Sequence, residues 1–152
     1  GVDRVELLNE IARLYWSARR SDTALAVITR SASEIAVHDA TPDAAPLAWE
    51  TPQETYWWLG VLHRDAGRYA EATPWLEQSL AAARAGTTRD HNEEGSRRMA
   101  ITSALSELYQ LECRQGNKAA AVNRLRELQE TCAAMLPESR SHGACNTERF
   151  RC

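Results

Sequence analysis

The residues best suited to chemistry are the cysteines, three of which lie in the last part of the chain from Cys132 onward. With His142 they form the spacing C-x9-H-x2-C-x6-C, which ends at Cys152. Thiolate and imidazole groups bind zinc, but this spacing is not that of a common zinc site. The same thiols form disulfides in an oxidising compartment. We expect free thiols here, with no metal and no other cofactor; a disulfide involving Cys132, Cys145 or Cys152 and a zinc site are the alternatives.

Cys113 and Cys132 lie near the ends of two consecutive predicted helices. Antiparallel packing places those two ends far apart, whereas a disulfide requires Cα atoms within about 7 Å of each other. We therefore expect that Cys113 and Cys132 do not pair with each other.

Histidine and carboxylate side chains give little support for catalysis. The four histidines are scattered along the chain: His38, His63, His91 and His142. Asp39 and Asp43 lie in a loop that has no nucleophile pattern beside them. The phosphate-binding pattern GxxxxGK is absent from the sequence. We predict no catalytic residue and expect a protein that is not an enzyme.

The composition is that of an ordinary globular chain, with 43% hydrophobic and 26% charged residues among 152 positions. A net charge of −3 provides no overall basic surface for nucleic acid. No apolar run approaches the ~18 residues of a membrane span, and the N-terminal GVDRVELLNE lacks the order of a signal peptide. We expect no nucleic-acid partner, no membrane insertion, and a soluble protein of the cytoplasm or an organelle interior rather than a secreted one.

The elements that position these residues are predicted to be helices. Ala, Arg, Glu and Leu are abundant, and no stretch alternates apolar and polar residues as a strand does. Six helices are predicted over 3–18, 21–38, 52–66, 69–84, 97–115 and 118–135. Short breaks alternate with long ones, and a short break makes consecutive helices antiparallel neighbours. The sequence therefore predicts an all-α fold of three helical hairpins.

The three hairpins repeat one pattern of residues. The junctions between their two helices lie 48 and 49 residues apart, at Arg19, Gly67 and Gly116. Five residues after each junction stands an alanine: Ala24, Ala72 and Ala121. Seven residues before it the first two units have the small Ala12 and Gly60, whereas the third has Tyr109. Three units at a near-constant period indicate a solenoid rather than a closed bundle.

The middle unit resembles a tetratricopeptide repeat. It has that family's residue types at the family's spacings: Leu59, Gly60, His63, Gly67, Tyr69, Ala72 and Leu76. The third unit matches at Leu108, Gly116, Ala121 and Leu125, and the first unit matches more loosely. The resemblance covers about residues 4–135. Because the usual repeat has about 34 residues, the longer units here, with Pro74 near the start of a helix, resemble the kinesin-light-chain subtype.

The resemblance implies a right-handed superhelix whose concave groove is lined by the first helix of each unit. It implies a repeat domain over 1–136, with units at about 4–38, 52–84 and 97–135, and a C-terminal tail over 137–152. Repeats of this family bind peptides or partner proteins and do no chemistry. We therefore expect a scaffold or adaptor within a larger complex. The alternative is a regulatory segment of a longer enzyme or transcription regulator.

The groove positions follow from the resemblance one by one. The predicted partner-binding residues are Asn9, Arg13, Trp16, Trp57, Val61, Arg64, Ser106 and Gln110. Trp57 is expected to face the groove, and Trp58 the neighbouring hairpin. The chaperone-binding carboxylate clamp is a poor match, because only Asn9 keeps a clamp residue. Trp and Arg dominate interface energies, so we expect a partner with apolar and acidic residues, unless these side chains pack on the same chain.

The segments outside the predicted helices carry three further expectations. Trp49 is expected to anchor its loop on its own hairpin, with a partner site as the alternative. The charged stretch 84–98 is expected to be a solvated loop. No capping helix is predicted after Pro137, although the last hairpin has an apolar face that needs cover. Either the tail folds back through Phe150, or another protein covers that face.

Overall fold

The computed structural model describes residues 2–135, 137 and 143–152. Its long helices are α1 (Val2–Ser17), α2 (Ser21–Ala40), α3 (Glu50–Asp65), α4 (Tyr69–Ala85), α5 (His91–Arg114) and α6 (Lys118–Ala133). Two short 3-10 helices follow, η2 (Gly143–Cys145) and η3 (Thr147–Arg149). None of the described residues lies in a strand, so the prediction of an all-α fold is confirmed. Within the same ranges, no helix combines the length and apolar character that a membrane span requires.

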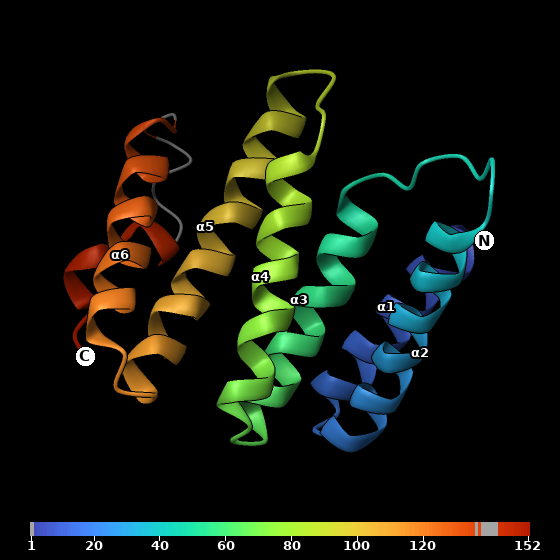
Figure 1. Ribbon diagram of the computed structural model, residues 1–152, viewed down its shortest axis with the longest axis horizontal. Coiled ribbons are helices and arrows are strands. Elements are labelled where there is room, and N and C mark those ends of the chain that lie inside the picture. The colour runs from blue at the N-terminus through green and yellow to red at the C-terminus, as the bar shows by residue number, and fades with distance from the viewer. Residues whose placement is uncertain (1, 136, 138–142) are drawn as a thin grey trace.

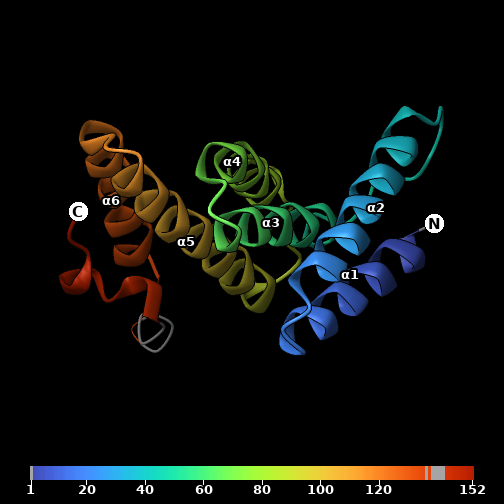
Figure 2. The same ribbon diagram turned by 90° about the horizontal axis from the view of Figure 1, so that it is seen from below.

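The six helices form three hairpins that stand side by side in a row, with α1 and α2 at one end and α5 and α6 at the other (Figure 1). Each helix packs against the next one in the chain. The first helices of the hairpins also touch, because α3 contacts both α1 and α5. Figure 2 shows α3 lying between these two helices. The central hairpin is therefore covered on both sides, whereas each outer hairpin has a neighbour on one side.

Each hairpin turns at a residue in the left-handed backbone region. The φ angles are 60° at Arg19, 78° at Gly67 and 78° at Gly116. The amide N–H of the following residue donates to the carbonyl five residues back, at 2.8 to 2.9 Å in all three turns. This hydrogen bond is that of the Schellman motif, which ends a helix and satisfies an unpaired carbonyl. Glycine adopts such a φ without steric cost, but Arg19 does not.

Small residues allow the two helices of a hairpin to pack closely. Gly60 of α3 faces α4, where a Cβ atom on this residue would lie 2.4 Å from Cγ of Leu76. The repeated alanines Ala24, Ala72 and Ala121 are fully buried. Tyr109 takes the place of Gly60 in the third hairpin and is also buried, with 5% of its surface exposed.

The prediction of a solvated loop over 84–98 is wrong for its second half, because α5 begins at His91 rather than at residue 97. Asp90 is the N-cap, and its carboxylate accepts a hydrogen bond of 2.9 Å from the amide N–H of Glu93. A capping side chain of this type satisfies an amide that has no partner within the helix. The Asp-x-x-Glu pattern at 90–93 is a sequence signal for this start.

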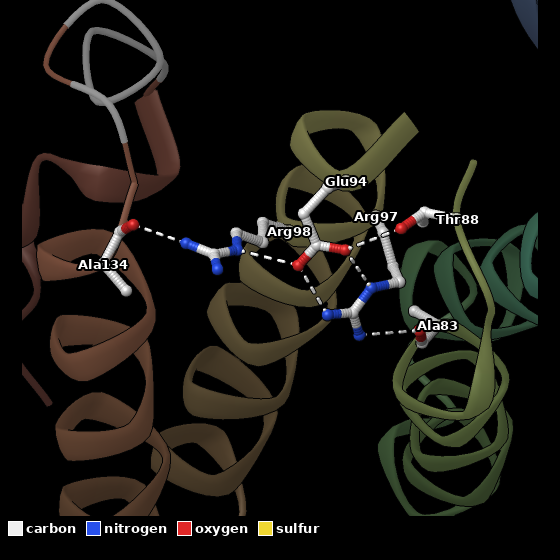
Figure 3. A network of polar contacts seen from close by, with 6 residues as sticks. All are labelled: Ala83, Thr88, Glu94, Arg97, Arg98 and Ala134. Atoms are coloured by element: carbon white, nitrogen blue, oxygen red, sulfur yellow. Dashed lines mark hydrogen bonds and ion pairs between the residues drawn. The ribbon is translucent and has the colours of Figure 1, made fainter. Parts of the chain in front are cut away.

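The early start of α5 positions a polar network between the second and third hairpins (Figure 3). The carboxylate of Glu94 accepts hydrogen bonds from Arg97 at 2.7 and 2.9 Å and from Arg98 at 3.0 Å. Arg97 also donates to the carbonyl of Ala83 near the end of α4, at 3.3 Å, and Arg98 to that of Ala134 at the end of α6. Cations at helix C-termini interact favourably with the helix dipole. One carboxylate thus orients two arginines that hold the ends of two other helices.

Candidate binding surface

The predicted groove residues lie on α1, α3 and α5, but the structure does not expose all of them. Arg13 is exposed, and 39% of the Trp16 surface is exposed. Three others are partly exposed: Trp57, Arg64 and Gln110. The remaining three are buried: Asn9 (1% exposed), Val61 (2%) and Ser106 (6%). The candidate surface consists of the first two groups, and we call it the first-helix face.

Asn9 is the centre of a buried polar network rather than a groove contact. Its Oδ1 accepts hydrogen bonds of 2.8 Å from the hydroxyls of Ser31 and Thr55. Its Nδ2 donates to the backbone carbonyl of Thr51 at 3.5 Å. These residues belong to α1, α2 and α3, so the network joins the first hairpin to the second. Buried polar groups are costly unless they are hydrogen-bonded, which explains why the amide and both hydroxyls point toward one another.

Val61 and Ser106 are buried for a different reason. Val61 belongs to the hydrophobic cluster that joins the first two hairpins, together with Ala12 and Leu62. Because α3 is packed between α1 and α5, more of its circumference is covered than that of a groove-lining helix with one neighbour. Ser106 lies on α5, which packs against α3, α4 and α6. In this arrangement of the helices, the side chains of Val61 and Ser106 are too buried to contact a partner.

The two arginines of the face already have partners in this chain. Arg13 donates to Glu10 one turn earlier, through Nε at 3.1 Å and through a second nitrogen. Arg64 bonds to Asp65 at 2.9 Å and to Glu107 of α5. Both arginines thus already take part in ion pairs within this chain. The expected preference for a partner with acidic residues stays a prediction.

The three tryptophans near this face form one aromatic group. Trp58 is buried, and its ring lies 5.3 Å from that of Trp16 and 5.1 Å from that of Trp57. The Trp16 indole also donates a 3.2 Å hydrogen bond to Asp65. Trp58 therefore packs toward the first hairpin, in agreement with the prediction.

Trp57 lies at the seam between the two hydrophobic clusters and contacts both. Its indole N–H is buried and has no hydrogen-bond partner among the described residues. Buried indole N–H groups usually find a partner. Trp57 was expected to face the groove. It is only partly exposed, because most of its ring packs against the two hydrophobic clusters.

Trp49 anchors the loop before α3, as expected. Its ring lies against Gly86 at the end of α4, where a Cβ atom would come within 2.5 Å of the indole Cγ. The ring also packs on the cluster formed by α4, α5 and α6. The loop is therefore held on the same chain, and no partner is needed to explain this tryptophan.

The cysteines form two disulfides, so the expectation of free thiols is wrong. Cys113 pairs with Cys152 and Cys132 pairs with Cys145, with Cα–Cα distances of 5.0 and 5.7 Å. As predicted, the two helix cysteines do not pair with each other. The zinc alternative fails because the thiols are used in disulfides; His142 lies outside the described residues. No group of three or more His, Cys, Asp or Glu side chains in the described ranges is arranged to hold a metal ion.

The disulfides bring the tail back along the last hairpin. One bond holds it at the C-terminal end of α6, and the other holds it at the C-terminal end of α5. Between them Phe150 is buried, with its ring 5.2 Å from that of Tyr109. Of the two expected ways to cover the last hairpin, the structure therefore has the tail folding back, but only over part of it, because Val122 of α6 stays 53% exposed. Tyr109 takes the place of a small residue because its ring packs on Phe150.

A cavity of about 550 Å³ lies between α5 and this tail. It is lined by Tyr109, Gln110 and Arg114 of α5, by Phe150 and Arg151 of the tail, and by the Cys113–Cys152 disulfide. Arg114 donates a 2.7 Å hydrogen bond to the hydroxyl of Tyr69 and lies over its ring. Gln110 thus faces the tail as well as the first-helix face. The contact between α5 and the tail was not predicted from the sequence, because the tail cysteines were expected to be free thiols.

His63 is held by Arg68, which lies in the turn between α3 and α4. Its Nδ1 accepts a 2.9 Å hydrogen bond from Nε of Arg68. Burial, and then the charge of Arg68, lower the pKa of His63 below its usual value. A neutral imidazole with one nitrogen occupied in this way fits a packing role.

No protein-family model, curated protein or solved structure matches the chain.

Proposed function

We propose that this chain is a non-catalytic protein-binding module, a scaffold or adaptor that holds a peptide or a partner subunit. The supporting architecture is a tetratricopeptide-like solenoid of the kinesin-light-chain style. Three features support this reading: a left-handed residue at the same place in each hairpin, the close contact of Gly60 with Leu76, and the contacts of α3 with α1 and α5. In such an arrangement the first helices line a continuous surface.

The observation that carries the proposal is the exposed tryptophan on the first-helix face. Trp16 shows 39% of its surface, and it is held in place by Trp58 and Asp65. A large aromatic ring that is both exposed and fixed in orientation loses little entropy when it is buried by a partner. Arg13 lies one turn away on the same helix and is exposed too.

The two disulfides indicate the kind of compartment in which this chain would bind its partner. Disulfides form and persist in oxidising compartments and are rare in the cytosol. We therefore propose an oxidising compartment for this chain, which fits an organelle interior but not the cytoplasm, the two places expected from the sequence. Oxidised and reduced forms should both be used when partners are sought.

The test is affinity purification with mass spectrometry, using the wild-type chain and the double variant Trp16→Ala, Arg13→Glu. Circular dichroism checks that the variant keeps its helix content, because Trp16 also packs on Trp58 and donates to Asp65. Loss of captured partners by the variant, at least tenfold, is the expected result.

The matched control is Val37→Ala with Arg126→Glu, which changes two exposed residues on α2 and α6 outside the first-helix face. The control is expected to retain the partners. Retention of every partner by the folded Trp16 variant would show that this face is not the binding surface.

A further inference from the structure

Carboxylates gather near the exposed Trp16 on the first-helix face. The indole N–H of Trp16 donates a 3.2 Å hydrogen bond to Asp65 of α3. On α1, Glu10 and Glu6 lie one and two turns before Arg13, and both are exposed. Residues at such spacings share one side of a helix. The two neighbouring helices therefore border this face with acidic side chains.

Glu54 of α3 shows that the carboxylates of the two helices lie close together. Its pKa is raised above the usual value. Partial burial is the largest cause, and it is opposed by a hydrogen bond with Trp58 and by the charge of Arg13. The negative charges of Glu10 and Glu6 raise the pKa further, so carboxylates of α1 and α3 repel one another here.

The charge of Arg13 does not balance this acidic group. Its guanidinium already forms an ion pair with Glu10. Glu6 and Glu54 form no ion pair with any residue that the structure describes. Two exposed carboxylates are thus left without a cation.

Arg64 does not supply the missing positive charge either. It pairs with Asp65 at 2.9 Å and also with Glu107 of α5. Two carboxylates therefore share one guanidinium. The first-helix face carries more negative than positive charge, and one of its carboxylates, that of Asp65, touches the exposed Trp16.

We propose that the partner of the first-helix face places a lysine or arginine side chain on Trp16, with its charge toward the carboxylates of α1 and α3. The methylene stem of such a side chain packs on the indole, and its cation is attracted both to the ring and to the carboxylates. An acidic segment would meet like charges instead, which weakens binding. This inference rests on the proposed function of the face, and it reverses the partner charge predicted from the sequence.

The first test needs no partner and measures the charge around Trp16 with two quenchers of tryptophan fluorescence, caesium and iodide ions, at constant ionic strength. The signal of Trp16 is the difference between the wild-type chain and Trp16→Phe. Each quenching constant is divided by that of N-acetyltryptophanamide, which removes the intrinsic difference between the ions. Caesium is then expected to quench roughly twofold better than iodide, because a negative field concentrates cations. Equal or better quenching by iodide overturns the proposal.

The variant for this test is Glu6→Gln with Glu54→Gln, which is expected to lose most of the preference for caesium. The matched control is Asp39→Asn with Glu130→Gln, which removes two exposed carboxylates of α2 and α6 outside the face. The control is expected to keep the preference. An equal loss in both variants would show that the net charge of the chain is the cause, and would overturn the proposal.

The second test takes the partners captured by the wild-type chain and determines the sign of the charge effect. Glu6→Gln with Glu54→Gln is expected to reduce capture roughly threefold, and Arg13→Glu alone to increase it, relative to Arg126→Glu on α6. Any other pattern overturns the proposal, and the opposite pattern would indicate an acidic partner. The loss expected for the variant Trp16→Ala, Arg13→Glu then comes from the ring, so Trp16→Ala alone should show it.

The two proposals fail in different ways. If the folded Trp16→Ala chain keeps every partner, the first-helix face is not the binding surface, and both proposals fail. If capture depends on Trp16 but Arg13→Glu weakens it, the proposed function stands and only the basic partner is ruled out.

Discussion

Gly60 shows how one missing side chain sets the distance between two helices. A Cβ atom here would lie 2.4 Å from Cγ and 2.8 Å from Cδ2 of Leu76, a side chain that is fully buried. Gly60→Ala is therefore expected to lower the free energy of unfolding by about 1–3 kcal/mol, as overpacked cores do. Urea denaturation measures the change.

Gly95 provides the matched control, because a Cβ atom at this position of α5 would meet nothing within 4 Å. Gly95→Ala is expected to stabilise the protein by about 0.5–1 kcal/mol, since alanine favours a helix and reduces the entropy of the unfolded chain. Equal effects of the two substitutions would contradict the role assigned to the Gly60–Leu76 contact.

Arg19 is the one turn residue of the three that is not glycine, yet its φ of 60° is as left-handed as theirs. Arg19→Gly is expected to raise the free energy of unfolding by roughly 1 kcal/mol, because a Cβ atom is strained in this region. Gly116→Ala, where φ is 78°, is expected to lower it by a similar amount. Thermal unfolding of both variants shows whether each is stabilised or destabilised. A destabilised Arg19→Gly variant would contradict the proposed backbone strain at Arg19.

Among the elements, α5 has a charged group, Glu94, that forms ion pairs near its start. Arg97 and Arg98 hydrogen-bond to Glu94 and lower the pKa of its carboxyl from 4.5 to about 2. A lowered folded-state pKa means that the carboxylate stabilises the fold above about pH 4.5. This stabilisation is lost as the pH falls toward 2.

Glu94→Gln is therefore expected to destabilise the protein at pH 7 by about 1 kcal/mol, a value reduced for the partial exposure of these side chains. The difference from wild type should shrink between pH 4.5 and pH 2. Denaturation over this pH range is the measurement, with Glu130→Gln on the exposed side of α6 as the control. A difference that stays constant with pH would rule out the ion pairs as its source.

At the scale of the whole molecule, two disulfides hold the tail against the last hairpin of the row. The expected peptide map under non-reducing conditions pairs Cys113 with Cys152 and Cys132 with Cys145. Replacing Cys113 and Cys152 by serine is expected to lower stability by about 2–4 kcal/mol, because the bond constrains the unfolded chain. It should also make Tyr109 more reactive to iodination, with the modified residue identified by mass spectrometry.

The comparison variant for this experiment is Glu148→Gln, an exposed position of the tail, which leaves both disulfides available. It is expected to unfold at the temperature of the wild type. Any other cysteine pairing in the map, or an unchanged Tyr109 reactivity after loss of the Cys113–Cys152 bond, would contradict this packing of the tail.

Local patterns in the sequence determined the helices and the three turns, because helix propensity, apolar spacing and left-handed turn residues act over a few neighbouring positions. These local patterns were sufficient to predict the turns at Gly67 and Gly116 and the alanines at the close contacts between helices. The sequence also contains the Asp-x-x-Glu pattern of the Asp90 cap, but the charged residues around it led to the prediction of a loop.

Only the tertiary structure decided which residues of the first helices stay accessible. Asn9 points to Ser31 and Thr55 because α1 packs on both α2 and α3. Val61 is buried because α3 has neighbours on both sides. Periodicity assigns a side chain to one face of a helix, but burial depends on what lies against that face. For the same reason the cysteine pairs could not be read from spacing: each bond joins residues that approach only when the tail packs on the last hairpin.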